Sequence, residues 1–306
     1  MRNAVLTITA ILLLVFGGIQ ASGAGKQNGF DKNSLFIRCE LSESSFYCNQ
    51  AVTAVIWLYS KDGEISSAEA LEKPAVEKAD MTTLSRIDID VRPRRERIKD
   101  EVYLAYPVAA YVLSMKDAGK NKFKPGVFRV GVNVPVVYND PFYGRIRGVE
   151  TRTFDVAAEP VSFKVKPLPA CDNGESFSGC VGNFSVETVI PKGRIIVNEE
   201  ATALVVLKGR GIIGNDILPE YREAFGNGTR LKSVSDRTET YFDGEGIYSE
   251  KVLECEFIPE RRDDCVIGKV RFGYFNPKTE RYEMAESEPV ELKVDSSTIM
   301  REKLEI

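Results

Sequence analysis

Cysteine is the residue type whose spacing most clearly suggests chemistry in this chain. The six cysteines fall into three local pairs: Cys39 with Cys48, Cys171 with Cys180, and Cys255 with Cys265. Separations of nine, nine and ten residues across turn-like stretches predict three local disulfides, although fifteen connectivities are formally open. Each bridge would add about 2.5 to 3 kcal/mol of stability in the chain-entropy description. The alternative is a redox or metal site, but the spacing is not C-x-x-C, and zinc would find only cysteines and carboxylates as ligands.

Histidine is absent from all 306 residues. Its absence excludes Ser-His-Asp and Cys-His catalysis and imidazole metal ligation, and it removes the commonest general base. Carboxylate-only chemistry stays open, but nothing in the sequence favours one pair among 45 acidic residues. The run from Gly209 to Gly211, with Gly214 after it, lacks the pattern of a phosphate-binding loop, so we expect a β-turn there. The sequence therefore predicts no catalytic residue, no metal site and no cofactor.

Arginine is concentrated in one short run of an otherwise acidic chain. The run comprises Arg92, Arg94, Arg95 and Arg97. Guanidinium groups match carboxylates and phosphates, so the run is a candidate contact for a partner. The alternative is a solvated connection between strands, which Glu96, Asp100 and Glu101 neutralise. The formal net charge of −4 leaves no global basic field, and we expect no nucleic-acid partner.

The elements that must position these residues are strands, because the patterning is almost wholly of that type. Alternation of apolar and polar residues predicts strands with one buried face at 161–166, 184–190 and 290–294. Residues 51–59 and 201–207 are apolar on both faces, as the central strands of a sandwich are. Residues 66–80, rich in Ala, Glu and Lys, could hold a short helix.

The first 24 residues have the three parts of an export signal. Arg2 supplies the positive charge, an apolar stretch runs from Ala4 to Phe16, and small residues at 21–24 suit cleavage. The alternative is an uncleaved anchor, but about 13 apolar residues fall short of the roughly 20 that span a bilayer. We therefore expect an exported protein, periplasmic or extracytoplasmic, with no membrane span in the mature chain and in a compartment that permits disulfides.

Two internal matches divide the chain. Glu159–Val165 recurs as Glu288–Val294 at an offset of 129, and Asn49–Leu58 aligns with Asn198–Leu207 at an offset of 149. Two matches in the same order favour duplication over chance, and the change of offset gives the first half about 20 extra residues, which we expect at 60–100. The predicted fold is all-β, with two tandem immunoglobulin-like β-sandwich domains. A signal peptide occupies 1–24, the domains occupy 25–166 and 170–295 with a proline-stiffened linker at 166–169, and a charged tail occupies 296–306.

Ordered motifs run through both halves. In the second half they are Val165–Pro169, Phe177–Phe184, Gly209–Gly211 with Asn215 and Pro219, and Gly273–Pro277 with Tyr282; in the first they are Gln50–Thr53 and Asp140–Tyr143. Together these motifs resemble the BatD family of exported bacterial proteins over residues 35 to 294. Two features depart from the family pattern. Cys180 stands where the family usually has alanine, which suggests that a Cys171–Cys180 bridge pins the linker and stiffens the hinge. The sequence also ends without the transmembrane helix common in the family.

The resemblance implies an accessory role. BatD-like proteins are encoded with a MoxR-type ATPase and the von Willebrand factor A domain proteins BatA and BatB, and are linked to oxygen tolerance and envelope stress. We therefore expect a non-enzymatic scaffold that binds envelope proteins through sandwich surfaces. One alternative is a carbohydrate-binding or adhesion module that uses Phe142 and Tyr143, although we expect these rings to cap a sandwich core. A hydrolase with paired carboxylates is a third reading.

Overall fold

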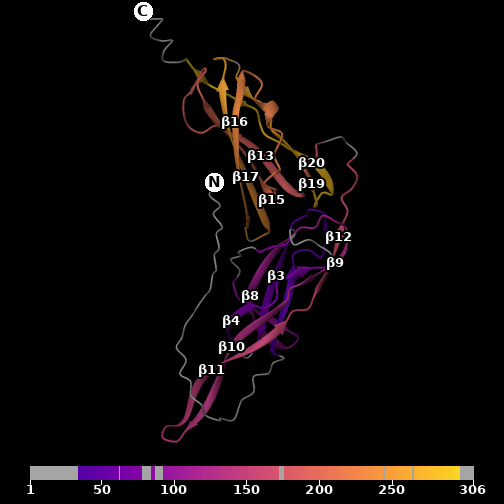
Figure 1. Ribbon diagram of the computed structural model, residues 1–306, viewed down its shortest axis with the longest axis vertical. Coiled ribbons are helices and arrows are strands. Elements are labelled where there is room, and N and C mark those ends of the chain that lie inside the picture. Colours follow the sequence, from indigo (N-terminus) through magenta and orange to yellow (C-terminus); the bar gives the residue numbers. More distant parts are fainter. Residues whose placement is uncertain are drawn as a thin grey trace, which may run out of the picture.

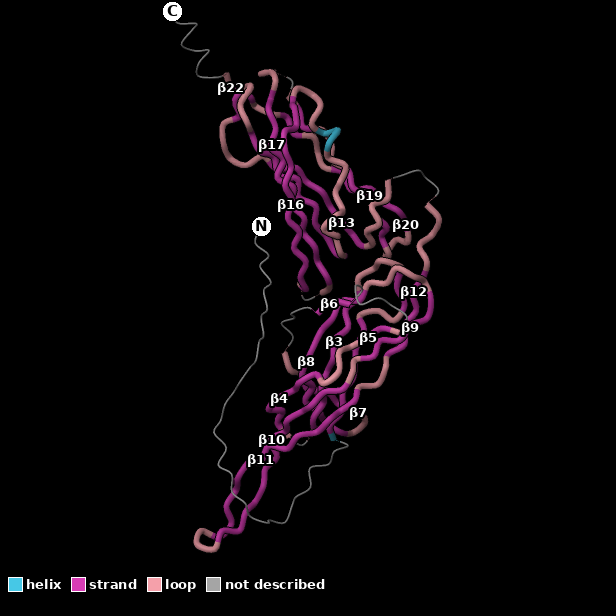
Figure 2. Tube along the Cα trace, viewed as in Figure 1, coloured by secondary structure: helices cyan, strands magenta, loops and turns pink. Residues whose placement is uncertain are grey.

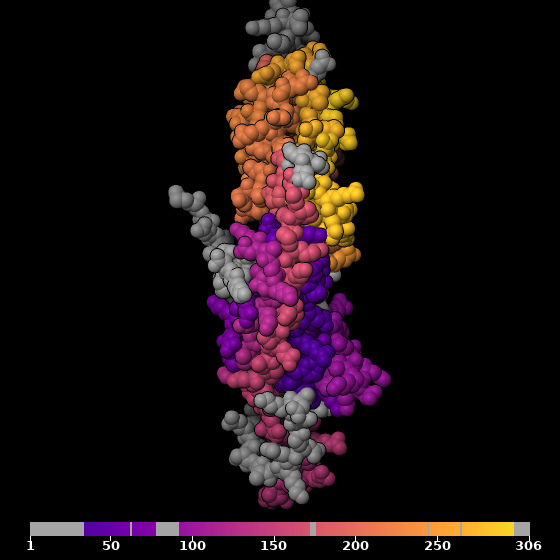
Figure 3. Space-filling view, turned by 90° about the vertical axis from the view of Figure 1, so that its right-hand side faces the viewer, coloured from indigo at the N-terminus to yellow at the C-terminus, as the bar shows by residue number. Residues whose placement is uncertain are grey.

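The fold is built from β-strands, as the sequence predicts, so the all-β prediction is confirmed. We describe a computed structural model of the chain, which defines residues 34–61, 63–77, 84–86, 92–171, 176–243, 245–263 and 265–296. The predicted signal peptide, and the predicted tail beyond residue 296, lie outside the described residues. Within the described ranges, no helix is long and apolar enough to cross a membrane. The two halves of the chain follow one another along an elongated molecule (Figures 1 and 3).

The first half contains three sheets. Its strands are β1 (Leu35–Leu41), β2 (Ser45–Tyr47), β3 (Val52–Ser60), β4 (Glu64–Ala70), β5 (Ala75–Val76), β6 (Leu84–Arg86), β7 (Arg94–Ile98), β8 (Glu101–Leu113), β9 (Gly119–Lys124), β10 (Val127–Asp140), β11 (Gly144–Ala157) and β12 (Val161–Lys166). One sheet has the order β1-β3-β8-β6, with β7 also paired to β8. The others have the orders β2-β12-β9-β5 and β11-β10-β4.

The core of the first half lies between the sheet that contains β3 and the other two sheets. Ala54 and Ile56 of β3 meet Val132 of β10 and Phe163 of β12 in one buried cluster. The other face of β3 is covered too, because Trp57 belongs to a second, smaller cluster. β3 is therefore apolar on both faces, and it lies between β1 and β8, which confirms the prediction of a central strand at 51–59.

The second half repeats the sandwich arrangement. Its elements are β13 (Gly182–Val189), β14 (Ile195–Ile196), β15 (Ala201–Gly211), the 3₁₀ turn η3 (Arg222–Ala224), β16 (Thr229–Phe242), β17 (Ile247–Pro259), β18 (Val266–Ile267), β19 (Arg271–Asn276), β20 (Arg281–Glu286), β21 (Val290–Glu291) and β22 (Val294–Asp295). A sheet of order β13-β15-β17-β16 faces the strand pairs β14-β22, β18-β21 and β19-β20. Leu207 and Phe257 from the sheet, and Phe272 from β19, share its core.

Three sequence predictions need correction. Residues 66–80, where a helix was an option, form β4 and β5 in their described part, because β4 adds to β10 and sheet pairing outweighs intrinsic propensity. The run Gly209–Gly211 ends strand β15 and is not a β-turn. A side chain at Gly209 would place its Cβ 2.1 Å from the Asn183 carbonyl oxygen, so glycine there permits close approach of β13. The strand predicted at 290–294 is divided into β21 and β22.

The turn before β3 recurs before β15. Asn49 and Asn198, which the longer repeat aligns, have left-handed φ angles of 62° and 63°. In each copy the preceding amide donates to the last residue of a closing strand, Lys166 or Asp295. The parallel pairs β2-β12 and β14-β22 also keep one register. The donors Cys48 and Val197 are therefore 149 positions apart and their acceptors Lys166 and Asp295 are 129 apart, as in the two sequence matches. The two halves share the same backbone arrangement at these positions.

The extra residues of the first half lie mainly in a hairpin, and the expectation of an insertion at 60–100 is wrong. The amides of Asn49 and Asn198 donate to the carbonyls of Met115 and Pro259, which are 144 positions apart. The offset between equivalent residues of the two halves is 149 at Asn49 and 144 at Met115, so the first half has gained only five residues by then. It falls to 129 at Lys166, which places the other 15 extra residues between Met115 and Lys166. In that remainder β10 and β11 have 14 residues each, whereas β19 and β20 have six. The first half is distinguished by its long β10–β11 hairpin (Figure 2).

Replacing Asn198 by alanine should destabilise the second half by about 1 kcal/mol, because alanine adopts the left-handed backbone conformation at a cost of this order. The matched variant Asn198→Gly should stay near the wild-type stability, since glycine takes this φ without steric strain. Chemical denaturation measures both variants. Equal losses for alanine and glycine would show that the asparagine side chain, and not the backbone angle, is what the turn requires.

Candidate functional site

The two halves meet through a chain of aromatic rings. Tyr47 at the end of β2 packs edge-on against Phe275 of β19, with ring centroids 4.8 Å apart. Phe275 in turn contacts Tyr282 at 5.2 Å, and Tyr282 contacts Phe177 at 5.0 Å. Val181 is buried among them. Edge-to-face pairs of this kind add about 0.5 to 1.5 kcal/mol each beyond the area they bury, so the halves are joined by a small core of their own.

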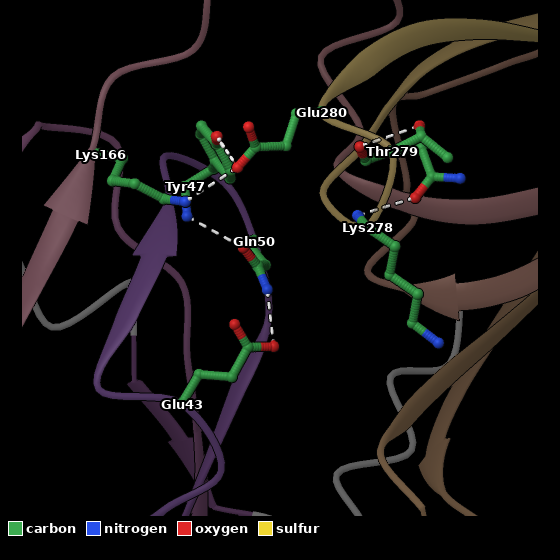
Figure 4. Close-up of polar contacts among 8 residues, drawn as sticks. Glu43, Tyr47, Gln50, Lys166, Lys278, Thr279 and Glu280 are labelled. Carbon is green, nitrogen blue, oxygen red and sulfur yellow. Dashed lines mark hydrogen bonds and ion pairs between the residues drawn. The ribbon is translucent and has the colours of Figure 1, made fainter.

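A charged group closes the exposed side of this joint (Figure 4). The Tyr47 hydroxyl donates to Glu280 Oε1 at 2.7 Å, and Lys166 Nζ lies 3.4 Å from the same oxygen and 3.8 Å from the centroid of the Tyr47 ring. The Tyr47 hydrogen bond and then Lys166 lower the pKa of Glu280. Asn49, held in its left-handed turn, donates from Nδ2 to the Gly179 carbonyl at 3.2 Å. The same turn that the repeat conserves therefore also carries contacts across the joint.

An open cleft of about 700 Å³ lies beside the joint. Its first wall comes from positions within 42–53 and from Lys166, and its second wall from 181–185, 208–211, 245–248 and 276–278. The first wall is ordered by Gln50, which accepts from the Tyr47 amide and donates to Glu43, both at 2.9 Å. The second wall is the end of the β13-β15-β17 sheet, where Gly182 and Gly209 let the backbones pack closely. The cleft is therefore set by backbone segments that the joint holds together.

Most charged groups in the cleft already have partners. Arg210 pairs with Asp243 at 2.9 Å and with Glu245 at 2.6 Å. The hydrogen bond from Arg210, and then the backbone amides of Glu245 and Gly246, lower the pKa of Asp243. Lys208 pairs with Glu187. Lys278 differs, because its backbone amide bonds Asn276 while its amine has no hydrogen-bond or ion-pair partner within the described ranges. A carboxylate that enters the cleft would meet this amine without displacing another partner.

The cleft is lined by polar and charged groups. They include the hydroxyls of Ser45, Ser185 and Tyr248, side-chain amides, the ammonium and guanidinium groups, and the two carboxylates of Glu43 and Glu245. Across the described part of the chain, no group of three or more Cys, Asp or Glu side chains is arranged to hold a metal ion. No cysteine lies in the lining. The arrangement suits hydrogen bonding to a polar, acidic segment.

The predicted Cys171–Cys180 bridge is not formed in the structure. Cys180 is buried in the second core, where burial raises the pKa of its thiol, whereas Cys171 is exposed. The linker is held by other contacts. The Tyr282 hydroxyl donates to the Pro169 carbonyl at 2.8 Å, and Leu168 packs on the joint. The aromatic joint therefore contacts the linker without a disulfide.

The bridges Cys39–Cys48 and Cys255–Cys265 are likewise not formed. Burial raises the pKa of Cys39 to about 12 and that of Cys255 to about 11, which keeps both thiols protonated at neutral pH. The Cys265 thiol lies 3.1 Å from each of two backbone carbonyl oxygens. Pairing in an oxidising compartment stays a prediction, which thiol titration of the exported protein decides.

The arginine run is divided between the faces of strand β7. The Arg94 guanidinium lies 4.0 Å from the Trp57 ring centroid and 2.6 Å from Glu40, so this residue closes the outer cluster of the first half. Strand alternation places Arg95 and Arg97 on the opposite face. These two and Arg92 are exposed, with no ion-pair partner in the part of the chain that the structure describes. Any partner contact by the run would therefore use Arg92, Arg95 and Arg97.

Phe142 and Tyr143 do not cap a sandwich core, which corrects the sequence expectation. They form the tip of the β10–β11 hairpin and are 92% and 83% exposed. The joint residues, by contrast, were not found from sequence as a site, because Tyr47 and Glu280 are 233 positions apart. Lys166 and Phe275 lie inside motifs that the sequence singled out, but nothing in those motifs names their partners.

Comparisons with known proteins give little further guidance. No protein-family model matches the chain, and no curated protein matches it. Among solved structures, the full-length major pilin SpaD from Corynebacterium diphtheriae aligns over 87% of this chain and 68% of its own, at 10% identity and a TM-score of 0.21. A likeness at that TM-score carries no argument.

Phe275→Leu should loosen the joint, because it removes two aromatic contacts from the cluster between the halves. We expect a loss of roughly 1 to 2 kcal/mol and a broader distribution of distances between the halves in small-angle scattering. Phe257→Leu is the matched control, since Phe257 is also fully buried but lies in the core of the second half. It should lower the melting temperature without changing the distance distribution. Indistinguishable scattering from the two variants would contradict the assignment of the joint to this cluster.

The joint should also weaken in acid. Because the pKa of Glu280 is lowered in the folded chain, its contribution is complete above the ordinary glutamate pKa and is lost as the pH falls through the lowered value. Scattering over a series of acidic pH values should show the distances between the halves broadening in that window. Glu280→Gln removes the titrating group and should abolish the change. A variant with the wild-type pH profile would assign the effect to other carboxylates.

Proposed function

We propose that this chain is a non-enzymatic, exported accessory protein of the BatD-like type that binds protein partners of the cell envelope. The proposal rests first on the motifs that resemble that family in the sequence. The structure supplies the observation that carries it, which is a polar cleft of about 700 Å³ beside a buried aromatic joint. A cleft whose walls are already ordered loses little conformational entropy when a partner binds.

The partner we infer is an acidic segment of an extracytoplasmic protein. The Lys278 amine has no hydrogen-bond or ion-pair partner among the residues that the structure describes, and the paired Lys208 and Arg210 line the same cleft. The lining holds four cationic side chains against two carboxylates, Glu43 and Glu245, and this local excess of positive charge in a chain of net charge −4 favours an acidic partner. By the family resemblance, von Willebrand factor A domain proteins of the BatA and BatB type are the candidates. Exported localisation, with or without an oxygen-tolerance role, belongs to the same proposal.

The test is co-purification of those candidates from the cell envelope with the wild-type protein and with cleft variants. Lys278→Glu reverses the charge of the unpaired amine, and Ser185→Trp fills the cleft from β13. Either change should reduce capture by about tenfold or more, as expected for loss of a central contact. Lys192→Glu is the matched control, because Lys192 is exposed and lies outside the cleft lining. Capture that neither cleft variant reduces would reject the cleft as the binding site.

A further inference from the structure

The far part of the β10–β11 hairpin projects from the first half as a ribbon of two strands (Figures 1 and 2). β4 pairs with β10 only as far as Asn133, whereas β10 and β11 continue to pair up to Asp140 and Gly144. No β10 side chain beyond Val134 is buried. A two-stranded ribbon in water has marginal stability by itself, so this extension is a costly feature unless something contacts it.

Apolar side chains lie on the exposed surface of this ribbon. Phe142 and Tyr143 at the tip are 92% and 83% exposed, and Val149 and Ile146 of β11 are 68% and 40% exposed. In the strand register, Ile146 is opposite Tyr138 and Val149 is opposite Pro135, so both faces carry apolar groups. Large exposed apolar groups gathered in one place mark a contact surface.

The backbone amides at the tip are satisfied by hydrogen bonds within the chain. Asp140 Oδ1 accepts hydrogen bonds from the backbone amides of Phe142 and Tyr143, both at 2.8 Å. Turn amides that would otherwise depend on water are thus satisfied within the chain. In the hydrocarbon of a bilayer an unsatisfied backbone group costs several kcal/mol, so internal satisfaction lowers the cost of bringing the turn close to that layer.

The charge of the tip favours an anionic surface. Arg145 and Arg147 lie on one face of β11, and neither has an ion-pair partner within the described ranges. The carboxylates that flank them in sequence are already engaged, since Asp140 binds the turn amides and Glu150 pairs with Arg152. The tip therefore presents two cations without a partner among the described residues, in a protein of net charge −4.

We propose that this tip docks on an anionic lipid bilayer. Phe142 and Tyr143 enter the headgroup region, where amphipathic and aromatic rings are favoured, while Arg145 and Arg147 bind lipid phosphates. Only the tip enters, because the outer edges of both strands keep backbone groups that need water. The contact is peripheral and goes beyond the proposed function, since it uses neither the cleft nor its partner.

Lipid fits the tip better than a glycan does. Sugar recognition requires polar side chains around an aromatic platform, and the one carboxylate at the tip, Asp140, is already committed to two amides. An acidic protein could also meet the arginines, but it would need a matching apolar pocket for two adjacent rings. A bilayer interface offers both anionic phosphates and an apolar layer without a preformed pocket.

The experiment is flotation of the purified protein with vesicles of phosphatidylglycerol and phosphatidylcholine, and with phosphatidylcholine alone. Binding should depend on the anionic lipid and should fall with added salt. Phe142→Ser with Tyr143→Ser should weaken it by about tenfold or more, and Arg145→Gln with Arg147→Gln by roughly tenfold. The variant Phe142→Trp should show a blue shift of its tryptophan emission only with anionic vesicles.

Matched controls separate the tip from the general surface. Tyr241→Ser removes another exposed aromatic residue, and Arg237→Gln with Arg281→Gln removes two exposed strand arginines elsewhere. Both should bind as the wild type does. No binding of the wild type to anionic vesicles, or equal weakening by tip and control variants, would overturn the proposal. Binding to a glycan array or to a protein that depends on the tip, without binding to vesicles, would also overturn the lipid proposal and would assign the tip to that partner.

Discussion

The contact between Tyr47 and Phe275 is the constraint on which the arrangement of the two halves depends. Tyr47 reaches Phe275 because it is the last residue of β2. The strand ends at Tyr47 because the Cys48 amide donates to the Lys166 carbonyl and Asn49, with its left-handed φ, then turns the chain. One backbone turn therefore fixes the ring, the Glu280 ion pair and the first wall of the cleft together. Changes in any of these should be felt in the others.

The two halves share a backbone arrangement at the repeat positions but differ in which side chains stand there and in length. The turn at Asn198 repeats the geometry of Asn49, but Ile196 stands at the place of Tyr47 and packs no ring across a joint. The first copy faces the second half, so a tyrosine there gains a partner. The other large difference is length, since 15 residues more lie between the equivalent positions that bracket the β10–β11 hairpin. The largest differences between the halves thus lie at this turn and at the hairpin.

The strands could be predicted from the sequence because burial on one or two faces leaves a local pattern, as in β3 and β12. The contacts that place side chains leave no such pattern. Cysteine spacing does not say that Cys180 lies in the second core while Cys171 is exposed. The arginine run is uniform in sequence, but in strand β7 Arg94 packs on Trp57 while Arg95 and Arg97 lie on the opposite face. The cleft unites segments from both halves, so no short stretch of sequence contains it. The helix option at 66–80 failed because residues up to Ala70 pair with β10 and Ala75–Val76 pair with β9.

The proposed lipid contact gives the aromatic joint a second consequence. Beyond Asn133 the ribbon extends for seven residues to Asp140, which is roughly 23 Å at the usual rise per residue. The tip lies at the end of the molecule opposite the second half (Figure 1). A tip bound at a bilayer would therefore hold the first half away from the surface, with the cleft farther out still. The height of the cleft would then be fixed only as firmly as Tyr47, Phe275 and Tyr282 fix the two halves. A flexible joint would leave a partner anchored in the same bilayer to search a wide volume, whereas a packed joint presents Lys278 at one distance from the surface.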